Sequence, residues 1–247
     1  MRRLRLVLIG LLLVLLIAAG GFVVWANTPP APTSPALDAL QSSSSVAVDT
    51  SRWIVFSPSA DDLDTGFIFY PGGRVDARSY SAPLRSIAEQ GYLVVNVPMP
   101  LNLAFFGIEN ADAVIAAYPD IEHWVIGGHS LGGAMAARYA HDHADIIEGL
   151  ALWASFAEDS FSLADSSIAA ASIYGTRDGL ATLDDIERSR TALPADTQFV
   201  AIEGGNHAQF GDYGEQAGDN TATISTAEQQ AQVVEATLAV LRAVSDQ

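Results

Sequence analysis

The sequence contains neither cysteine nor lysine, and both absences limit the chemistry that the protein can perform. Without cysteine the chain cannot form disulfides, thiolate metal sites or a cysteine nucleophile. All 12 basic residues are arginines and they face 29 acidic residues, so that the formal net charge is −17 at pH 7. Three arginines precede the first acid, Asp38, and the rest of the chain therefore carries a net charge of −20. A chain this acidic repels nucleic acid, and we expect no nucleic-acid partner.

Common cofactor-binding signatures are also missing. No Walker loop, dinucleotide fingerprint or zinc motif is present, and we expect neither a cofactor nor a metal. The acidic loop with Asp212, Glu215 and Asp219 lacks the spacing of a calcium-binding EF-hand loop, so we interpret it as a solvated turn.

Residues 1–26 contain a long apolar segment that we interpret as a membrane anchor. Leu6 to Trp25 is an uncharged run of 20 residues, and a helix of that length crosses a hydrocarbon layer of about 30 Å. Arginines at positions 2, 3 and 5 favour a cytoplasmic N-terminus, which places the rest of the chain outside the cytoplasm. The alternative is secretion after cleavage of a signal near Ala26, but the apolar region of a signal usually spans only about 7 to 15 residues. We therefore expect a single-pass membrane protein.

The remaining residues divide into a linker and one domain. Residues 27–50 are rich in proline and serine, and we interpret them as an extended linker. Residues 51–247 alternate between strand-like and helical patterns. The predicted strands are Trp53–Phe56, Gly66–Tyr70, Tyr92–Val97, Trp124–Gly127, Gly149–Trp153, Ala169–Tyr174 and Gln198–Ile202. The predicted helices are Ser79–Gln90, Glu109–Tyr118, Leu131–His143, Leu183–Ala192 and Thr226–Val244. Apolar strands separated by helices indicate an α/β fold with a mostly parallel, doubly wound sheet, whose ligand site lies at the strands' carboxyl ends.

The stretch GGHSLGGAMA, residues 127–136, places Ser130 between Gly128 and Gly132, where a predicted strand meets a predicted helix. This is the pattern of a nucleophile elbow, G-x-S-x-G, in which a tight turn raises a serine hydroxyl above the sheet. Glycines are needed because the turn leaves no room for neighbouring side chains. Ser130 is the predicted nucleophile.

A serine nucleophile needs a histidine base and a carboxylate that orients it, in the chain order serine, acid, histidine. His207 lies in a glycine-containing loop after the strand 198–202, and its position fits the base. The other histidines come too early or fall at a predicted helix end; they are His123, His129, His141 and His143.

Asp178 is the predicted acid, because it follows the strand ending near Tyr174 and can reach a histidine on the neighbouring loop. Glu158 and Asp159, which follow the strand ending at Trp153, are the alternatives.

The oxyanion of an acyl-transfer intermediate requires two N–H donors. We predict the backbone amide of Leu131, directly after the nucleophile, and that of Gly73 in the loop YPGGRVDARSY, with Arg74 as the next choice.

Five segments together carry a family resemblance: FYPGGRVDARSY, VVNVPMPLNLAFFG, GGHSLGGAMAARYA, SIYGTRDG and EGGNHAQFGDYG. Over most of residues 52–245 they resemble the alpha/beta hydrolase fold-5 family of dienelactone-hydrolase-like proteins. The resemblance implies a compact α/β-hydrolase core and a triad of Ser130, Asp178 and His207. The chain carries serine where dienelactone hydrolases proper carry cysteine, so their substrate is not implied.

The surroundings of the predicted site are open. The short connection between Trp153 and Ala169 leaves no room for a large helical cap. The apolar stretch 98–108 could line an acyl pocket, touch the bilayer or make core contacts. Phe156, Phe161 and Phe210 could add walls to the pocket.

These features predict a membrane-tethered serine hydrolase that cleaves a carboxylic ester, or less readily an amide or thioester, through an acyl-enzyme. Its expected partners are a small-molecule ester and, through the N-terminal helix, the lipid bilayer. The alternatives are a non-catalytic binding or envelope protein with a hydrolase fold, and an exported peptidase.

Overall fold

The computed structural model describes residues 2–60 and 63–246, in which eight strands form a single sheet. The strand order across the sheet is β1-β2-β4-β3-β5-β6-β7-β8. The strands are β1 (Val46–Asp49), β2 (Ile54–Pro58), β3 (Thr65–Tyr70), β4 (Leu93–Asn96), β5 (His123–His129), β6 (Ile147–Trp153), β7 (Ala169–Gly175) and β8 (Gln198–Ile202). The strands from β4 to β8 are parallel, whereas β1 and β2 pair antiparallel at one edge. The predicted α/β fold with a mostly parallel sheet is confirmed.

Except for α2, which was not predicted, the helices lie close to the predicted ranges. They are α1 (Arg2–Ala26), α2 (Ser34–Asp38), α3 (Ser81–Ala88), α4 (Asn110–Ile115), α5 (Leu131–Asp142), α6 (Leu183–Ser189) and α7 (Thr226–Ser245). Several short 3-10 helices join them, including η1 (Ala77–Tyr80), η2 (Pro100–Asn102), η3 (Ala104–Phe106), η4 (Asp159–Phe161), η5 (Arg190–Ala192) and η6 (Ala208–Phe210). The last long helix begins at a capping box, in which the side chains of Ser225 and Glu228 bond each other's backbone N–H groups.

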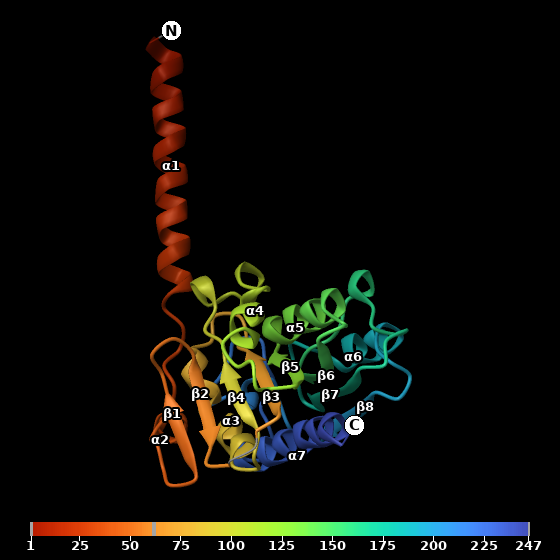
Figure 1. Ribbon diagram of the computed structural model, residues 1–247. Coiled ribbons are helices and arrows are strands. Elements are labelled where there is room, and N and C mark those ends of the chain that lie inside the picture. The colour runs from red at the N-terminus through yellow and green to blue at the C-terminus, as the bar shows by residue number, and fades with distance from the viewer. Residues whose placement is uncertain (1, 61–62, 247) are drawn as a thin grey trace.

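Both faces of the sheet are covered, and the alternation of β3 demonstrates this. Every residue of β3 is buried. Phe67 and Phe69 pack into the cluster that contains residues of α3 and α7, whereas Ile68 and Tyr70 pack into the cluster that contains residues of α5. Figure 1 shows α5 and α7 on opposite sides of the sheet. A strand buried on both faces explains why its sequence is a continuous apolar run.

The segment 27–50 differs from our interpretation as an extended linker. It contains α2 and β1, and β1 pairs with β2 at the sheet edge. Ala36 and Val46 are fully buried, and the amide of Thr33 donates to the carbonyl of Asp212. The alternating apolar residues Val46 and Val48 allow this short stretch to add a strand, although its flanks are rich in proline and serine.

The first helix projects away from the domain as a single rod (Figure 1). Residues Leu4–Ala26 form a helix that is long and apolar enough to cross a membrane, with a mean hydropathy of 3.0 over its most apolar window. Its length and composition also suit a signal sequence. No other helix among the described residues meets this criterion.

Candidate active site

Ser130 lies at the sharp junction between β5 and α5. Its backbone has φ 52° and ψ −123°, in the left-handed region that side-chain-bearing residues seldom adopt. The flanking glycines are sterically required, since a Cβ at Gly128 would lie 2.6 Å from the carbonyl oxygen of Tyr70. A Cβ at Gly132 would collide with the same oxygen. This is the local geometry of a nucleophile elbow, in which backbone strain holds the hydroxyl at a helix N-terminus.

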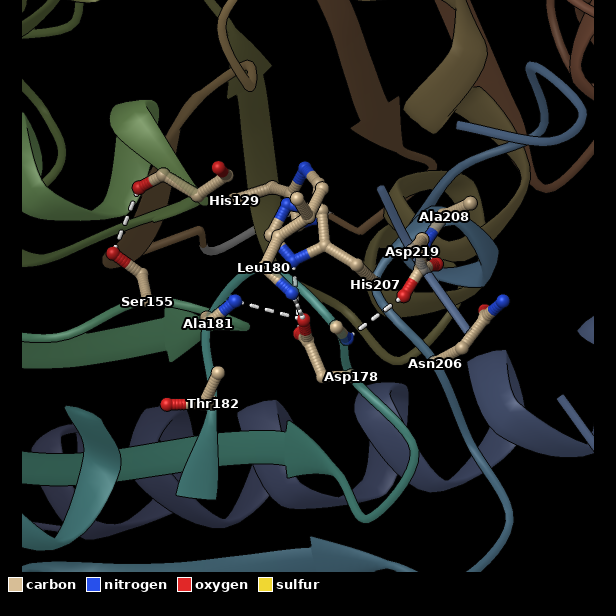
Figure 2. A network of polar contacts seen from close by, with 12 residues as sticks. His129, Ser155, Asp178, Leu180, Ala181, Thr182, Asn206, His207, Ala208 and Asp219 are labelled. Carbon is tan, nitrogen blue, oxygen red and sulfur yellow. Dashed lines mark hydrogen bonds and ion pairs between the residues drawn. The ribbon is translucent and has the colours of Figure 1, made fainter. Parts of the chain in front are cut away.

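Asp178 and His207 are brought together by two adjacent parallel strands. Asp178 follows β7, His207 follows β8, and the two strands are paired. Asp178 Oδ2 lies 2.8 Å from His207 Nδ1, and each side chain is only 1% exposed. Asp178 Oδ1 accepts the amides of Leu180 and Ala181, each at 2.8 Å (Figure 2). The carboxylate is therefore held by donors on both oxygens, and its bond to Nδ1 leaves Nε2 free to accept a proton.

Ser130 and His207 line the same pocket, which has a volume of about 310 Å³. His207 Nε2 is buried and has no hydrogen-bond partner among the described residues. In particular, His207 Nε2 makes no hydrogen bond to the Ser130 hydroxyl in the described structure. Such bonds are often long in the absence of substrate and tighten in the complex. The pocket also includes Ser155, whose hydroxyl donates to the Ser130 carbonyl at 2.7 Å.

The pocket wall is mostly apolar. Its remaining residues are Leu131, Ala134, Met135, Ala154, Phe156, Glu158, Leu180 and Ala181. Phe156 thus lies where we expected a wall, whereas Phe210 is a fully buried core residue and Phe161 stacks with Arg138. Glu158 and Asp159, the alternative acids, are exposed and make no bond to His207 in the described structure.

The two predicted oxyanion donors are close neighbours. A Cβ at Gly73 would lie 3.2 Å from Leu131 Cδ2 and 3.5 Å from Leu131 Cβ. The amides of Gly72 and Arg74 are already engaged, with the hydroxyl of Tyr80 at 3.1 Å and the carbonyl of Asn102 at 2.7 Å. Within the described residues, neither the Gly73 amide nor the Leu131 amide has an acceptor. Both amides are therefore unengaged in the described structure, as the predicted role requires.

The sequence did not predict the role of His129, whose ring packs against that of His207. The ring of His129 is fully buried and its centroid lies 4.5 Å from that of His207. Its Nδ1 lies 2.8 Å from the hydroxyl of Tyr80, which itself accepts the Gly72 amide. Burial raises the pKa of Tyr80, so its hydroxyl stays protonated beside His129 Nδ1. Only the place of His129 inside the elbow motif pointed to this role.

His129 is kept uncharged by its surroundings. Burial first, and then the charge that His207 can carry, hold the pKa of His129 well below its ordinary value. A neutral ring in this position packs against His207 without repelling the imidazolium that forms during proton transfer.

The acidic loop does more than our interpretation as a solvated turn allows. Asp219 accepts the amide of Gly179 at 3.0 Å and that of Ala208 at 2.9 Å, and so it bridges the Asp178 and His207 loops (Figure 2). Asp212 is 7% exposed, and burial raises the pKa of its carboxyl. Tertiary contacts between loops explain this difference, since local spacing does not reveal them.

Among the described residues, one group of side chains has ligand atoms close enough together to hold a metal ion. Ligand atoms of Glu109, Asp112 and His143 all lie within 4.8 Å of one another. His143 already bonds Glu109 at 2.9 Å, and Asp112 accepts the hydroxyl of Tyr139 at 2.6 Å. His143 caps the far end of α5, about 18 Å along the helix from the elbow at 1.5 Å per residue. The group is therefore separate from the candidate active site.

Comparisons with known proteins identify the fold and the family. The sequence pattern of the alpha/beta hydrolase family matches residues 66–231, which is more than half of the chain. No match was found among curated proteins. A predicted CIB-like hydrolase from Thermoplasma acidophilum superposes with a TM-score of 0.56 at 16% identity, over 81% of this chain and 100% of that one.

Two solved structures of esterases have the same fold. Est1E from Butyrivibrio proteoclasticus, bound to ferulic acid, has a TM-score of 0.60 at 13% identity, over 78% of this chain and 97% of its own. A bacterial heroin esterase has a TM-score of 0.60 at 15% identity, over 83% of this chain and 88% of its own. Together with the family match over residues 66–231, the sheet topology and the elbow confirm the resemblance seen in the sequence: the chain belongs to the alpha/beta hydrolase family.

Proposed function

We propose that the protein is a membrane-tethered serine hydrolase that cleaves carboxylic esters outside the cytoplasm. The observation that carries this proposal is the Asp178–His207 pair, because His207 lines the same pocket as Ser130 and its Nε2 has no hydrogen-bond partner among the described residues. An ester fits better than an amide, because the pocket wall is apolar and esters have the better leaving group. The esterases among the structural neighbours support the same substrate class.

The proposed reaction proceeds in two acyl transfers. His207 Nε2 takes the proton of Ser130 while the serine oxygen attacks the ester carbonyl, and the amides of Gly73 and Leu131 bind the oxyanion. His207 then protonates the departing alcohol, which leaves an acyl-Ser130 ester. Water, deprotonated by His207, attacks this ester, and His207 returns the proton to the Ser130 oxygen as the acid is released. Asp178 stays ionised and stabilises the imidazolium in both steps.

The apolar wall of the pocket suits the acyl group. Leu131, Met135 and Phe156 offer contact to a short hydrocarbon chain, and a volume of about 310 Å³ is at the lower end of the range for small-molecule pockets. We therefore infer a substrate with a compact, uncharged acyl group.

Labelling with a fluorophosphonate tests the proposal. The wild-type protein, reconstituted in detergent, should take up the probe, and Ser130→Ala should abolish labelling because no other hydroxyl is activated by His207. Ser155→Ala is the matched control, since Ser155 lies in the same pocket, and it should still be labelled. Absence of label on the folded wild-type protein would favour a binding protein. Faster hydrolysis of peptide amides than of p-nitrophenyl esters would favour a peptidase.

A further inference from the structure

Residues 97–108, which follow β4 and end just before Glu109 and α4, form an apolar surface that we call the apolar turn. It contains no charged residue. Phe105 and Phe106 are 45% and 49% exposed, and their ring centroids lie 4.2 Å apart. Among the residues described after α1, no other large aromatic side chain is exposed. A paired aromatic surface of this kind indicates a contact site, because isolated apolar side chains are common on surfaces but aromatic pairs are not.

The apolar turn is bonded to the end of α1. Asn102 in the turn donates from Nδ2 to the carbonyl of Ala26 at 3.0 Å, and its own carbonyl accepts the amide of Arg74. The Arg74 side chain donates to the carbonyl of Trp25 at 3.0 Å, and its guanidinium lies 4.1 Å from the centroid of the Trp25 ring. Figure 1 shows the yellow-green turns before α4 beside the foot of α1. The turn therefore lies level with the last residues of the apolar helix.

This level is where a bilayer interface would lie if α1 spans a membrane. Trp25 is 48% exposed at that end of the helix, and aromatic rings concentrate in the interfacial layer of a bilayer. The net charge of −20 after α1 excludes most of the domain from close contact with lipid, but the apolar turn contributes none of it. The chemistry of the turn matches lipid.

The apolar turn also borders the candidate site. A Cβ at Gly73 would lie 3.8 Å from the side chain of Leu103 in the turn and 3.2 Å from that of Leu131. β2 points away from α1 in Figure 1 and is antiparallel to β4, so the carboxyl ends of the parallel strands face the α1 side. The oxyanion donors and the exposed aromatic pair thus belong to the same end of the domain.

We propose that Phe105 and Phe106 insert into the interfacial layer of the bilayer that α1 spans, and that the site takes its ester from this membrane. The second part rests on the proposed hydrolase function. An apolar ester that leaves the bilayer along the apolar turn arrives beside Gly73 and Leu131, where its carbonyl oxygen is to be bound.

Depth measurements on the full chain test the membrane contact without reference to catalysis. Because the chain has no cysteine, single variants Phe105→Cys and Phe106→Cys can each be labelled with an environment-sensitive fluorophore. Ala195→Cys, in the exposed connection before β8 at the opposite end of the strands, is the matched control. In phosphatidylcholine vesicles, labels at 105 and 106 should shift their emission to shorter wavelength and be quenched by spin-labelled lipid, whereas the label at 195 should not. Equal, solvent-like emission or equal quenching at all three positions overturns the proposal.

Substrate presentation distinguishes the two parts of the inference. Phe105→Ser with Phe106→Ser should leave hydrolysis of a water-soluble acetate ester unchanged. The same change should slow severalfold the hydrolysis of the acetate of a long-chain alcohol, an ester with a compact acyl group that embeds in the same vesicles. Equal rates on the embedded ester for both proteins would overturn the route from the membrane. If the wild-type protein hydrolyses neither ester, the proposed function fails, while the depth measurement still decides whether the apolar turn contacts lipid.

Discussion

At the scale of single residues, the two oxygens of Asp178 have different partners, and this difference makes the acid testable. Oδ1 accepts two backbone amides and Oδ2 meets His207 Nδ1. In Asp178→Asn, the amide oxygen should stay with the backbone donors, so that the NH₂ group faces Nδ1. Nδ1 must then accept, the ring proton moves to Nε2, and His207 can no longer deprotonate Ser130. We expect kcat to fall about 10⁴-fold, as with the same change in a serine-protease triad.

Steady-state hydrolysis of p-nitrophenyl acetate measures this loss, with circular dichroism to verify the fold. Glu158→Gln is the matched control, because Glu158 belongs to the pocket but makes no bond to His207 in the described structure. Its kcat should stay near that of the wild type. The reverse outcome, with activity lost in Glu158→Gln and kept in Asp178→Asn, would assign the acid to Glu158.

His129 should make folding stability depend on pH. Its pKa in the folded protein lies well below the ordinary 6.5, because burial and His207 disfavour its charge. Below about pH 6.5 the unfolded chain therefore binds a proton that the folded chain does not, and the free energy of unfolding decreases as pH falls. His129→Gln removes this contribution and should reduce the slope by up to about 1.4 kcal/mol per pH unit.

Guanidinium unfolding of both proteins at pH 7.5, 6.5 and 5.5 measures the slopes. Asp212 acts in the opposite direction, since its raised pKa favours the folded state when the carboxyl is protonated, but it is common to both proteins. Identical slopes would show that the folded protein binds a proton at His129 as readily as the unfolded chain does.

At the scale of elements, α1 is bonded to the loop that carries Gly73, the proposed oxyanion donor. Arg74 follows Gly73, and its side chain donates to the carbonyls of Trp25 and Thr28. A planar guanidinium makes both bonds while stacking on the Trp25 ring, which an ammonium cannot reproduce. We therefore expect Arg74→Ala and Arg74→Lys both to loosen the junction between helix and domain.

Amide hydrogen exchange should reveal this loosening. The backbone around residues 25–33 and 72–76 should exchange about tenfold faster in the Arg74 variants, which corresponds to a loss of about 1.4 kcal/mol in local stability. Arg52→Ala is the control, because Arg52 stacks on Trp53 at the same 4.1 Å but makes no bond to α1 in the described structure. Unchanged exchange in Arg74→Ala would mean that the junction is held without this side chain.

At the scale of the whole molecule, the charge imbalance should oppose compactness. The residues after α1 carry a net charge of −20, so the folded domain concentrates negative charge. At 0.1 M, salt largely screens the repulsion between exposed charges that lie more than about 10 Å apart. The melting temperature of the detergent-solubilised protein should therefore rise by a few degrees between 0.02 and 0.2 M sodium chloride. Sucrose at matched osmolality is the control. A melting temperature that falls with salt would show that attractive ion pairs, such as that between Arg85 and Glu89, outweigh the repulsion.

The features that could be predicted from the sequence are those that depend on short, contiguous stretches of the chain. The order of strands and helices was predictable because it depends on contiguous patterns, as in the all-buried run of β3 and the helix that follows Ser130. The elbow was predictable for the same reason, since the room it needs is made by glycines two residues away on either side. The order of Ser130, Asp178 and His207 along the chain restricted the candidate triad to a few side chains before any distance was known.

Only the tertiary structure decided the contacts between residues far apart in the chain. It brings Asp178 within hydrogen-bonding distance of His207 and places the Tyr80–His129 pair beside them. It also joins the Asp178 and His207 loops through Asp219. Each contact joins segments 11 to 49 residues apart, and its geometry depends on the strand order and on the packing of the helices. Local patterns determine which element forms, whereas burial on both faces of the sheet determines which elements meet.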